Sequence, residues 1–331
     1  MPRPVILSSG AFADLPLATV AAKAAEWGYS GLELCCQGDH LEVQQALGSA
    51  DYPAGRLAVL ADHELQCPVI AAHHVGQAVC DAVDERHKSL LPDYVWGDGD
   101  PSAVRERAAA EIVSTVRAAQ ALGAGVVCGF TGSPLSSHVL GWPPPSGEVV
   151  ANGFRAFADR WHPILDACHE AGVRFAAHVH PGQVAFDYYT AERALEVLDG
   201  REEFGLLFDP APLHWQGVDP VAFLRRFADR IYHVHVTDAV LTLDGRSGVL
   251  GSLLPAGDPR RGWQPRSPGR GGIDWDAIVR ALNEIGYDGP LAVDWADPGL
   301  DRDFGAEDAC RFVKQIDVPG PPRSRPAFRN L

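Results

Sequence analysis

The chain has 331 residues, which is enough for one large domain or for two of average size. Its 28 Lys and Arg residues against 43 Asp and Glu residues give a formal net charge of −15 at pH 7. This acidic balance argues against a nucleic-acid partner and against an anionic membrane surface, because both attract a basic face. A hydrophobic fraction of 46% and a charged fraction of 21% are typical of a globular protein.

Two other protein classes are excluded by simple patterns. The sequence contains no run of 18 or more apolar residues, so no transmembrane helix is predicted. The first ten residues, MPRPVILSSG, are better explained by a first strand than by a signal peptide. Seven cysteines, an odd number without a C-x-x-C pair, indicate neither a disulfide framework nor a zinc knuckle. We therefore expect a cytoplasmic protein that keeps its thiols reduced.

Short apolar runs alternate with helical periodicity along most of the chain. The runs predict buried parallel strands, which begin at Val5, Gly31, Pro68, Gly125, Val173, Phe204, Ile231 and Leu291. The intervening helical segments include Leu15–Trp27, Pro101–Leu122, Ala151–Ala171, Ala191–Leu198, Pro220–Phe227, Trp275–Ile285 and Phe304–Ile316. Eight strands in this α/β alternation favour a closed (β/α)₈ TIM barrel over an open doubly wound sheet.

Three insertions are too long for ordinary strand-to-helix loops. They cover Gly76–Asp100, Thr131–Val150 and Asp238–Gly272, and each follows a predicted strand. Because loops after strands lie on the C-terminal face of a barrel, where barrel active sites are built, we expect the insertions to surround the site. We predict a single barrel domain over residues 1–318 and a Pro- and Arg-rich tail over residues 319–331.

Polar side chains gather where four consecutive predicted strands end. Strand five ends at His178 and His180, strand six at Asp209, strand seven contains His235, and strand eight ends at Asp294. Alternation along a strand allows one side chain from each to face the lumen. His178, Asp209, His235 and Asp294 would then offer two imidazoles and two carboxylates to one divalent metal ion: Mn, Zn, Co, Fe or Mg. The alternative is that these groups only cap loops.

Four segments carry a resemblance to a known family. They are FDPAPLHWQGVDP (208–220), IYHVHVTDA (231–239), SPGRGGIDW (267–275) and LAVDWADPGLDRDFGAEDACRFV (291–313). With them the chain resembles the sugar phosphate isomerase/epimerase superfamily, the xylose isomerase-like TIM barrels, from Pro4 to Ile316. Members of that family hold one divalent metal ion with Glu, Asp, His and Glu from strands five to eight. The resemblance places His178, Asp209, His235 and Asp294 at those positions.

The chain departs from the family pattern at the two Glu positions. His178 and Asp294 stand where the family has Glu, while Pro212 and Thr237 are further departures. In the family the two Glu ligands exchange a proton with the substrate carbon, and a metal-bound imidazole is a poor general base. We therefore expect Asp294 to act as base or ligand, with His178 as a second candidate. His180 could supply the missing acid/base group, because free His has a pKa near 6.5.

The resemblance also suggests residues that contact the substrate. It implies that Arg270, in the segment P-G-R-G-G, reaches a substrate oxygen; a surface salt bridge is the alternative. His74, His214 and Asp238 are the further substrate-binding candidates, and His74 rather than His73 is expected to face the lumen. Glu33, on strand two, is expected to point into the barrel floor or to pair with a cation.

The function implied by the resemblance is a metal-dependent isomerase or epimerase that removes a proton next to a carbonyl of a carbohydrate or polyol. A lyase or dehydratase that eliminates from a keto-sugar or keto-glycoside, including C-glycoside cleavage, is the alternative. A degenerate, non-catalytic barrel or partner subunit is a third hypothesis. A DNA-repair endonuclease of the same fold is disfavoured by the charge of −15. The expected partner is a small carbohydrate-like substrate, and homo-oligomerisation is left open.

Overall fold

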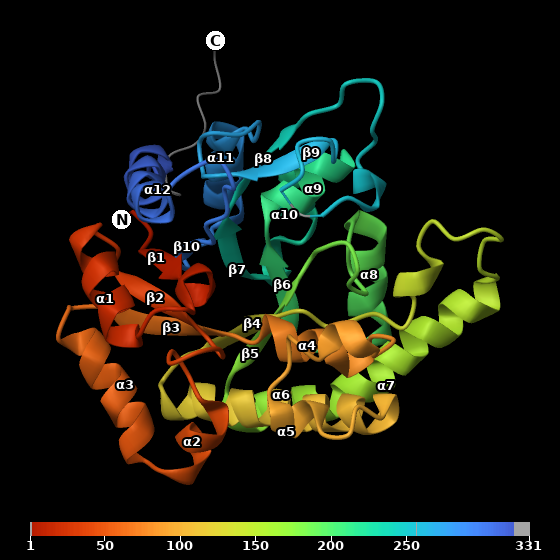
Figure 1. Ribbon diagram of the computed structural model, residues 1–331, viewed down its shortest axis with the longest axis horizontal. Helices are drawn as coiled ribbons and strands as arrows, with labels where there is room; N and C mark the ends of the chain where they lie inside the picture. Colours follow the sequence, from red (N-terminus) through yellow and green to blue (C-terminus); the bar gives the residue numbers. More distant parts are fainter. Residues whose placement is uncertain (1, 256, 321–331) are drawn as a thin grey trace.

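In the computed structural model, which describes residues 2–255 and 257–320, the strands close into the predicted barrel (Figure 1). Around the barrel the order is β1-β10-β7-β6-β5-β4-β3-β2, with the paired strands parallel. The strands are β1 Val5–Ser8, β2 Gly31–Cys35, β3 Gln66–Ala71, β4 Val126–Gly129, β5 Arg174–His178, β6 Phe204–Phe208, β7 Ile231–Val236 and β10 Leu291–Val293. The structure confirms the (β/α)₈ prediction, and each strand begins within two residues of its predicted start.

Helices surround the barrel and pack on its outer surface (Figure 1). They are α1 Leu17–Glu26, α2 Val43–Gly48, α3 Asp51–Ala61, α4 His73–Cys80, α5 Asp93–Trp96, α6 Pro101–Ala121, α7 Gly147–Ala171, α8 Tyr188–Val197, α9 Pro210–Gln216, α10 Pro220–Arg226, α11 Trp275–Ile285 and α12 Arg302–Ile316. Their ends follow local chemistry: Asp100 caps α6 by accepting the Ala103 N–H, and α7 stops at Gly172 in the left-handed conformation. Among the described residues, no helix is both long and apolar enough to cross a membrane.

The apolar core has two layers. The outer layer, between strands and helices, contains large aromatics such as Trp161 and Phe175, whose ring centroids lie 4.5 Å apart. The lumen is filled by smaller side chains: Ile6, Cys35, Val69, Ala71, Cys128, Ala176, Leu207 and Ala292. Because side chains alternate along each strand, this lumen layer determines which residues point into the mouth above it.

The insertions contain regular structure that the sequence did not predict. The first insertion holds most of α4 together with α5. The third forms an antiparallel hairpin, β8 Asp238–Leu241 with β9 Trp263–Arg266, and Trp263 stacks on Trp215 with ring centroids 4.6 Å apart. The predicted tail lies outside the described residues from position 321 onward.

Gly76 allows α4 to approach β4 and provides a test of the packing. A Cβ at Gly76 would lie 2.1 Å from the backbone carbonyl oxygen of Phe130, which a side-chain movement cannot relieve. We expect Gly76→Ala to lower the free energy of unfolding by roughly 2 kcal/mol. Gly55, exposed within α3, has no heavy atom within 4 Å of the position that a Cβ would occupy, so Gly55→Ala should raise stability by about 0.5–1 kcal/mol. Urea unfolding of both variants checks the pair; a neutral Gly76→Ala would contradict this packing.

Candidate active site

Inward-facing polar residues continue the lumen layer toward the C-terminal mouth of the barrel. On each strand the polar residue lies two positions after a lumen residue, so it faces the same side. The resulting set is His73 after Ala71, His178 after Ala176, Asp209 after Leu207 and Asp294 after Ala292, joined by His233 and His235 from β7. The mouth is therefore lined mainly by imidazoles and carboxylates.

His178 has both ring nitrogens engaged. Its Nε2 lies 3.0 Å from Oδ2 of Asp209, and its Nδ1 lies 3.1 Å from Nε2 of His73. Burial lowers the pKa of His178 to about 4 despite the neighbouring carboxylate. Asp209 also accepts hydrogen bonds from the Thr237 hydroxyl and from the Ala211 N–H, where it caps α9. His178 and Asp209 are thus fixed in orientation and neither is free to move.

A buried carboxylate, Glu33 of β2, lies beneath these residues. Its Oε2 is 2.6 Å from Nε2 of His233 and 2.9 Å from Nε2 of His235, and its Oε1 accepts from the Ser8 hydroxyl. Burial acts to raise the pKa of Glu33, but the two imidazoles outweigh it and hold the pKa well below the usual value. Burial likewise acts to lower the pKa of His235, and the charge of Glu33 raises it to about 9. Glu33 and His235 form a buried ion pair.

Asp294 and His180 lie nearer the opening. Asp294 keeps 38% of its side chain exposed, with Oδ2 3.6 Å from Nδ1 of His235. Surrounding protein nevertheless desolvates the carboxyl group, which together with the charges of Glu33 and Asp209 raises its pKa. The ring of His180 is centred 5.7 Å from that of His178, and its Nδ1 is 2.7 Å from the carbonyl oxygen of Pro181. Since a carbonyl only accepts, Nδ1 carries the proton and Nε2 has a free lone pair.

The donor set fits a divalent metal ion. His73, His178 and His235 each present a ligand atom, and these atoms lie within 4.8 Å of one another. Within the described chain, Nδ1 of His235 is buried without a hydrogen-bond partner, while Nε2 of the same ring is held by Glu33. A ring nitrogen directed at a carboxylate, with the other nitrogen unpaired, is the arrangement that metal-binding histidines use. A bound ion would displace the proton that Nδ1 of His235 carries in the ion pair with Glu33. Asp209 lies 3.0 Å from Nε2 of His178 but is not part of this three-histidine cluster. The ligand set of His178, Asp209, His235 and Asp294 stays a prediction, with His73 as a further candidate.

The structure corrects the choice between the two adjacent histidines at positions 73 and 74. His73 faces the mouth because it shares the inward side of Ala71, whereas His74 faces the opposite way and lies 2.5 Å from Nε2 of Gln37. Strand β3 ends at Ala71, and α4 begins two residues later, at His73.

Within the described residues, none of the other predicted substrate contacts forms a hydrogen bond with His178, Asp209 or His235. Arg270 forms an ion pair with Asp308 of α12 at 2.7 Å, the salt-bridge alternative considered for it. Asp238 accepts the backbone N–H groups of Gly269 and Ile273, so it holds the loop that carries Arg270. His214 lines a surface hollow between α9, α10 and α11. Contact of these residues with the substrate stays a prediction.

Sequence reasoning undervalued His73 and Glu33. The signal for His73 was its spacing of two residues from Ala71 at the end of an apolar run, which the adjacent His74 obscured. Glu33 was recognised as a floor residue, but its partners on β7 are 200 and 202 positions away, so sequence spacing could not reveal them.

The metal site predicts a defined stoichiometry. Loaded with Mn²⁺ or Zn²⁺ and then desalted, the protein should retain about one ion per chain by elemental analysis. His235→Ala and Asp209→Asn should lose it, because each removes a first ligand. His214→Ala is the matched control and should retain the ion, since His214 lies outside the cluster. Full retention by His235→Ala would contradict the site.

The buried ion pair predicts that Glu33→Gln changes the stability of the protein in a pH-dependent way, once bound metal has been removed with a chelator. The pKa of His235 is about 9 in the folded protein and about 6.5 in the unfolded chain. Protonated His235 therefore stabilises the fold fully below about pH 6.5, and this contribution is lost as the pH rises through about 9. The lowered pKa of Glu33 stabilises the fold above about pH 4.3. The free energy of unfolding of the wild type should therefore exceed that of Glu33→Gln by about 3 kcal/mol near pH 6, and by less above pH 9. Urea unfolding measures both; a difference independent of pH would contradict the pair.

Known proteins share both the sequence pattern and the fold of this chain. The family model described as xylose isomerase-like TIM barrel matches residues 21–316. Inosose dehydratase of Geobacillus kaustophilus (strain HTA426) is 29% identical over 185 residues, which cover 51% of this chain and 54% of that protein. The chain thus spans about half the length of the curated relatives it matches.

Two solved structures share the fold over nearly their whole length. The 3-keto-D-glucoside 4-epimerase YcjR from E. coli superposes with a TM-score of 0.67 at 13% identity, covering 95% of this chain and 99% of that one. The IOLI protein, solved with a bound zinc atom, superposes with a TM-score of 0.62 at 17% identity, covering 96% of each chain. At these identities the two likenesses establish the fold.

Proposed function

Because the chain belongs to the xylose isomerase-like TIM barrel family, we propose that it is a metal-dependent dehydratase of a cyclic keto-polyol or related keto-sugar. One observation carries the choice of reaction. Of the four positions predicted for metal ligands, Asp294 alone combines exposure at the mouth with a raised pKa. The names of two relatives, inosose dehydratase and 3-keto-D-glucoside 4-epimerase, support a substrate that carries a ketone.

Elimination needs only one proton-transfer group on one face of the substrate. Asp294, as carboxylate, takes the proton from the carbon beside the ketone and then returns it to the hydroxyl group leaving the next carbon. The C–H and C–O bonds break, a C=C bond forms, and one water molecule leaves. A divalent ion held by His178, Asp209 and His235 would polarise the ketone as a Lewis acid. His178 takes no part in proton transfer, because both of its ring nitrogens are engaged.

Epimerisation or isomerisation, the reaction that the family resemblance puts first, is the second candidate. This reaction needs a second group that delivers a proton to the other face of the substrate carbon or to the neighbouring carbon. The position of His180 near the opening favours this reaction, because His180 can be that group. Burial lowers the pKa of His180, so the ring is neutral at pH 7 and its free Nε2 can accept a proton. Epimerisation or isomerisation therefore requires His180, whereas elimination does not.

Product analysis separates the two reactions. The metal-loaded protein is incubated with inosose in D₂O, and products are followed by mass spectrometry and NMR. We expect loss of one water molecule and appearance of an unsaturated ketone. Asp294→Asn should lower kcat about 10³-fold, the usual contribution of a general base, while His180→Asn should lower it less than about tenfold.

An epimer as the main product, with His180→Asn as impaired as Asp294→Asn, would establish the second candidate instead. Absence of both deuterium incorporation and dehydration with inosose and with 3-keto-glucosides would contradict both reactions. Arg280→Lys is a matched control, because Arg280 is exposed on α11 and pairs with Asp276 of the same helix, so its substitution should leave kcat unchanged.

A further inference from the structure

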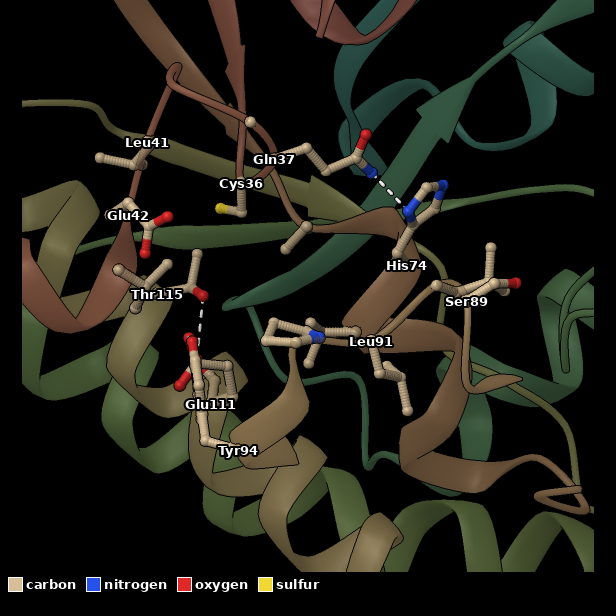
Figure 2. A pocket seen from close by; sticks show the side chains of 16 residues that line it. Cys36, Gln37, Leu41, Glu42, His74, Ser89, Leu91, Tyr94, Glu111 and Thr115 are labelled. Atoms are coloured by element: carbon tan, nitrogen blue, oxygen red, sulfur yellow. Dashed lines mark hydrogen bonds between the residues drawn. The ribbon is translucent and has the colours of Figure 1, made fainter. Parts of the chain in front are cut away.

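A second cavity lies outside the barrel, beside the C-terminal ends of β2 and β3 (Figure 2). Its volume is about 370 Å³, and α2, α4 and α6 contribute to its walls. His74 and Gln37 lie on one side of it, and Glu111, Thr115 and Tyr94 lie on the other (Figure 2). His73 turns into the barrel mouth while His74 turns into this cavity, so the two sites are neighbours but separate.

Glu111 of α6 is a buried carboxyl group without a cationic partner. Only 5% of the residue is exposed. Its oxygens accept hydrogen bonds from the Tyr94 hydroxyl at 2.7 Å and from Nε2 of Gln44 at 2.5 Å. No Lys, Arg or His in the described part of the chain forms a salt bridge with it. Tyr94 and Gln44 satisfy the hydrogen bonds of Glu111, but no positive charge neutralises it when it is ionised, and buried carboxylates are normally paired with one.

The electrostatic surroundings of Glu111 are consistent with a missing cation. Burial raises the pKa of Glu111, and the like charge of Glu42 on the cavity wall acts in the same direction. Burial lowers the pKa of His74, so this imidazole is neutral at pH 7. Among the described residues that line the cavity there is neither Lys nor Arg. An anionic ligand would meet two carboxyl groups here and no positive charge.

The remaining walls of the cavity suit a small ligand that carries few charges. Leu41, Val75 and Leu91 provide apolar surface, and Ser89 and Thr115 provide hydroxyl groups. The walls thus combine apolar surface with a similar amount of polar surface, which suits a ligand that has both an apolar body and a polar group. A six-membered ring bearing one ammonium group satisfies the volume, the apolar walls and the charge of Glu111 together.

We propose that this cavity binds a small organic amine as its ammonium ion, paired with Glu111 and surrounded by Leu91 and Tyr94. The site is independent of the metal ion and of the reaction at the mouth, because none of the mouth residues lines it. The ammonium group supplies the positive charge that the buried carboxylate lacks, and this gives selectivity against alcohols and acids of the same shape.

Three probes of matched shape test the proposal by isothermal titration calorimetry at pH 7.5: cyclohexylamine, cyclohexanol and cyclohexanecarboxylate. We expect the amine to bind at least tenfold more tightly than the alcohol and the acid not to bind. Glu111→Gln should weaken amine binding at least tenfold. Glu106→Gln, an exposed position on the same helix, is the matched control and should leave binding unchanged. Ser89→Trp narrows the cavity while keeping Glu111 and should also weaken binding.

Two further measurements separate this cavity from the mouth. Amine binding should persist after chelation of bound metal and in Asp294→Asn. Binding that disappears with chelation would place the amine on the metal and overturn the proposal. Equal binding of amine and cyclohexanol, unchanged amine binding by Glu111→Gln, or no amine binding at millimolar concentration would each overturn it as well. Circular dichroism of Glu111→Gln checks that the variant is folded.

Discussion

The mouth of this barrel depends on one buried ion pair, between Glu33 on β2 and His235 on β7. The two residues are 202 positions apart in sequence, and β1 and β10 lie between their strands in the barrel. A carboxylate without exposed surface is expensive unless it is paired, so Glu33 fixes the imidazoles that face it. Because Glu33 engages Nε2 of His235, the Nδ1 of the same ring is directed toward Asp294 and the opening.

That orientation connects the floor of the barrel with the chemistry at its mouth. His178 stands where the xylose isomerase-like family has a Glu. One of its ring nitrogens contacts Asp209, and the other contacts His73. An imidazole held in this way can offer a lone pair to a metal ion only in place of one of these two contacts, and it is not a mobile base. Of the two positions where the family has Glu, only position 294 carries a carboxyl group in this chain, and this asymmetry is the basis of the proposed elimination.

Much of the fold could be predicted from sequence because barrel strands are short, apolar and buried on both faces. The candidate ligands could be predicted for the same reason, since the alternation of His178 and Asp209 with lumen residues is local. The sequence prediction places His74 in the lumen because the apolar run extends to both histidines, whereas the two-residue spacing from Ala71 turns His73 inward. The ion pair of Arg270 could not be predicted from the local sequence, because its partner, Asp308, lies on α12.

The most direct measurement of the proposed metal centre is an anomalous difference map from crystals of the protein grown with Zn²⁺ or Mn²⁺. We expect one strong peak at about 2.0–2.2 Å from ring nitrogens of His178 and His235 and from an oxygen of Asp209. Asp294 should remain at the opening, within reach of a ligand placed beside the ion. A peak that excludes His178 and His235, or metal-saturated crystals without a peak at the mouth, would contradict the proposed site and the reaction built on it.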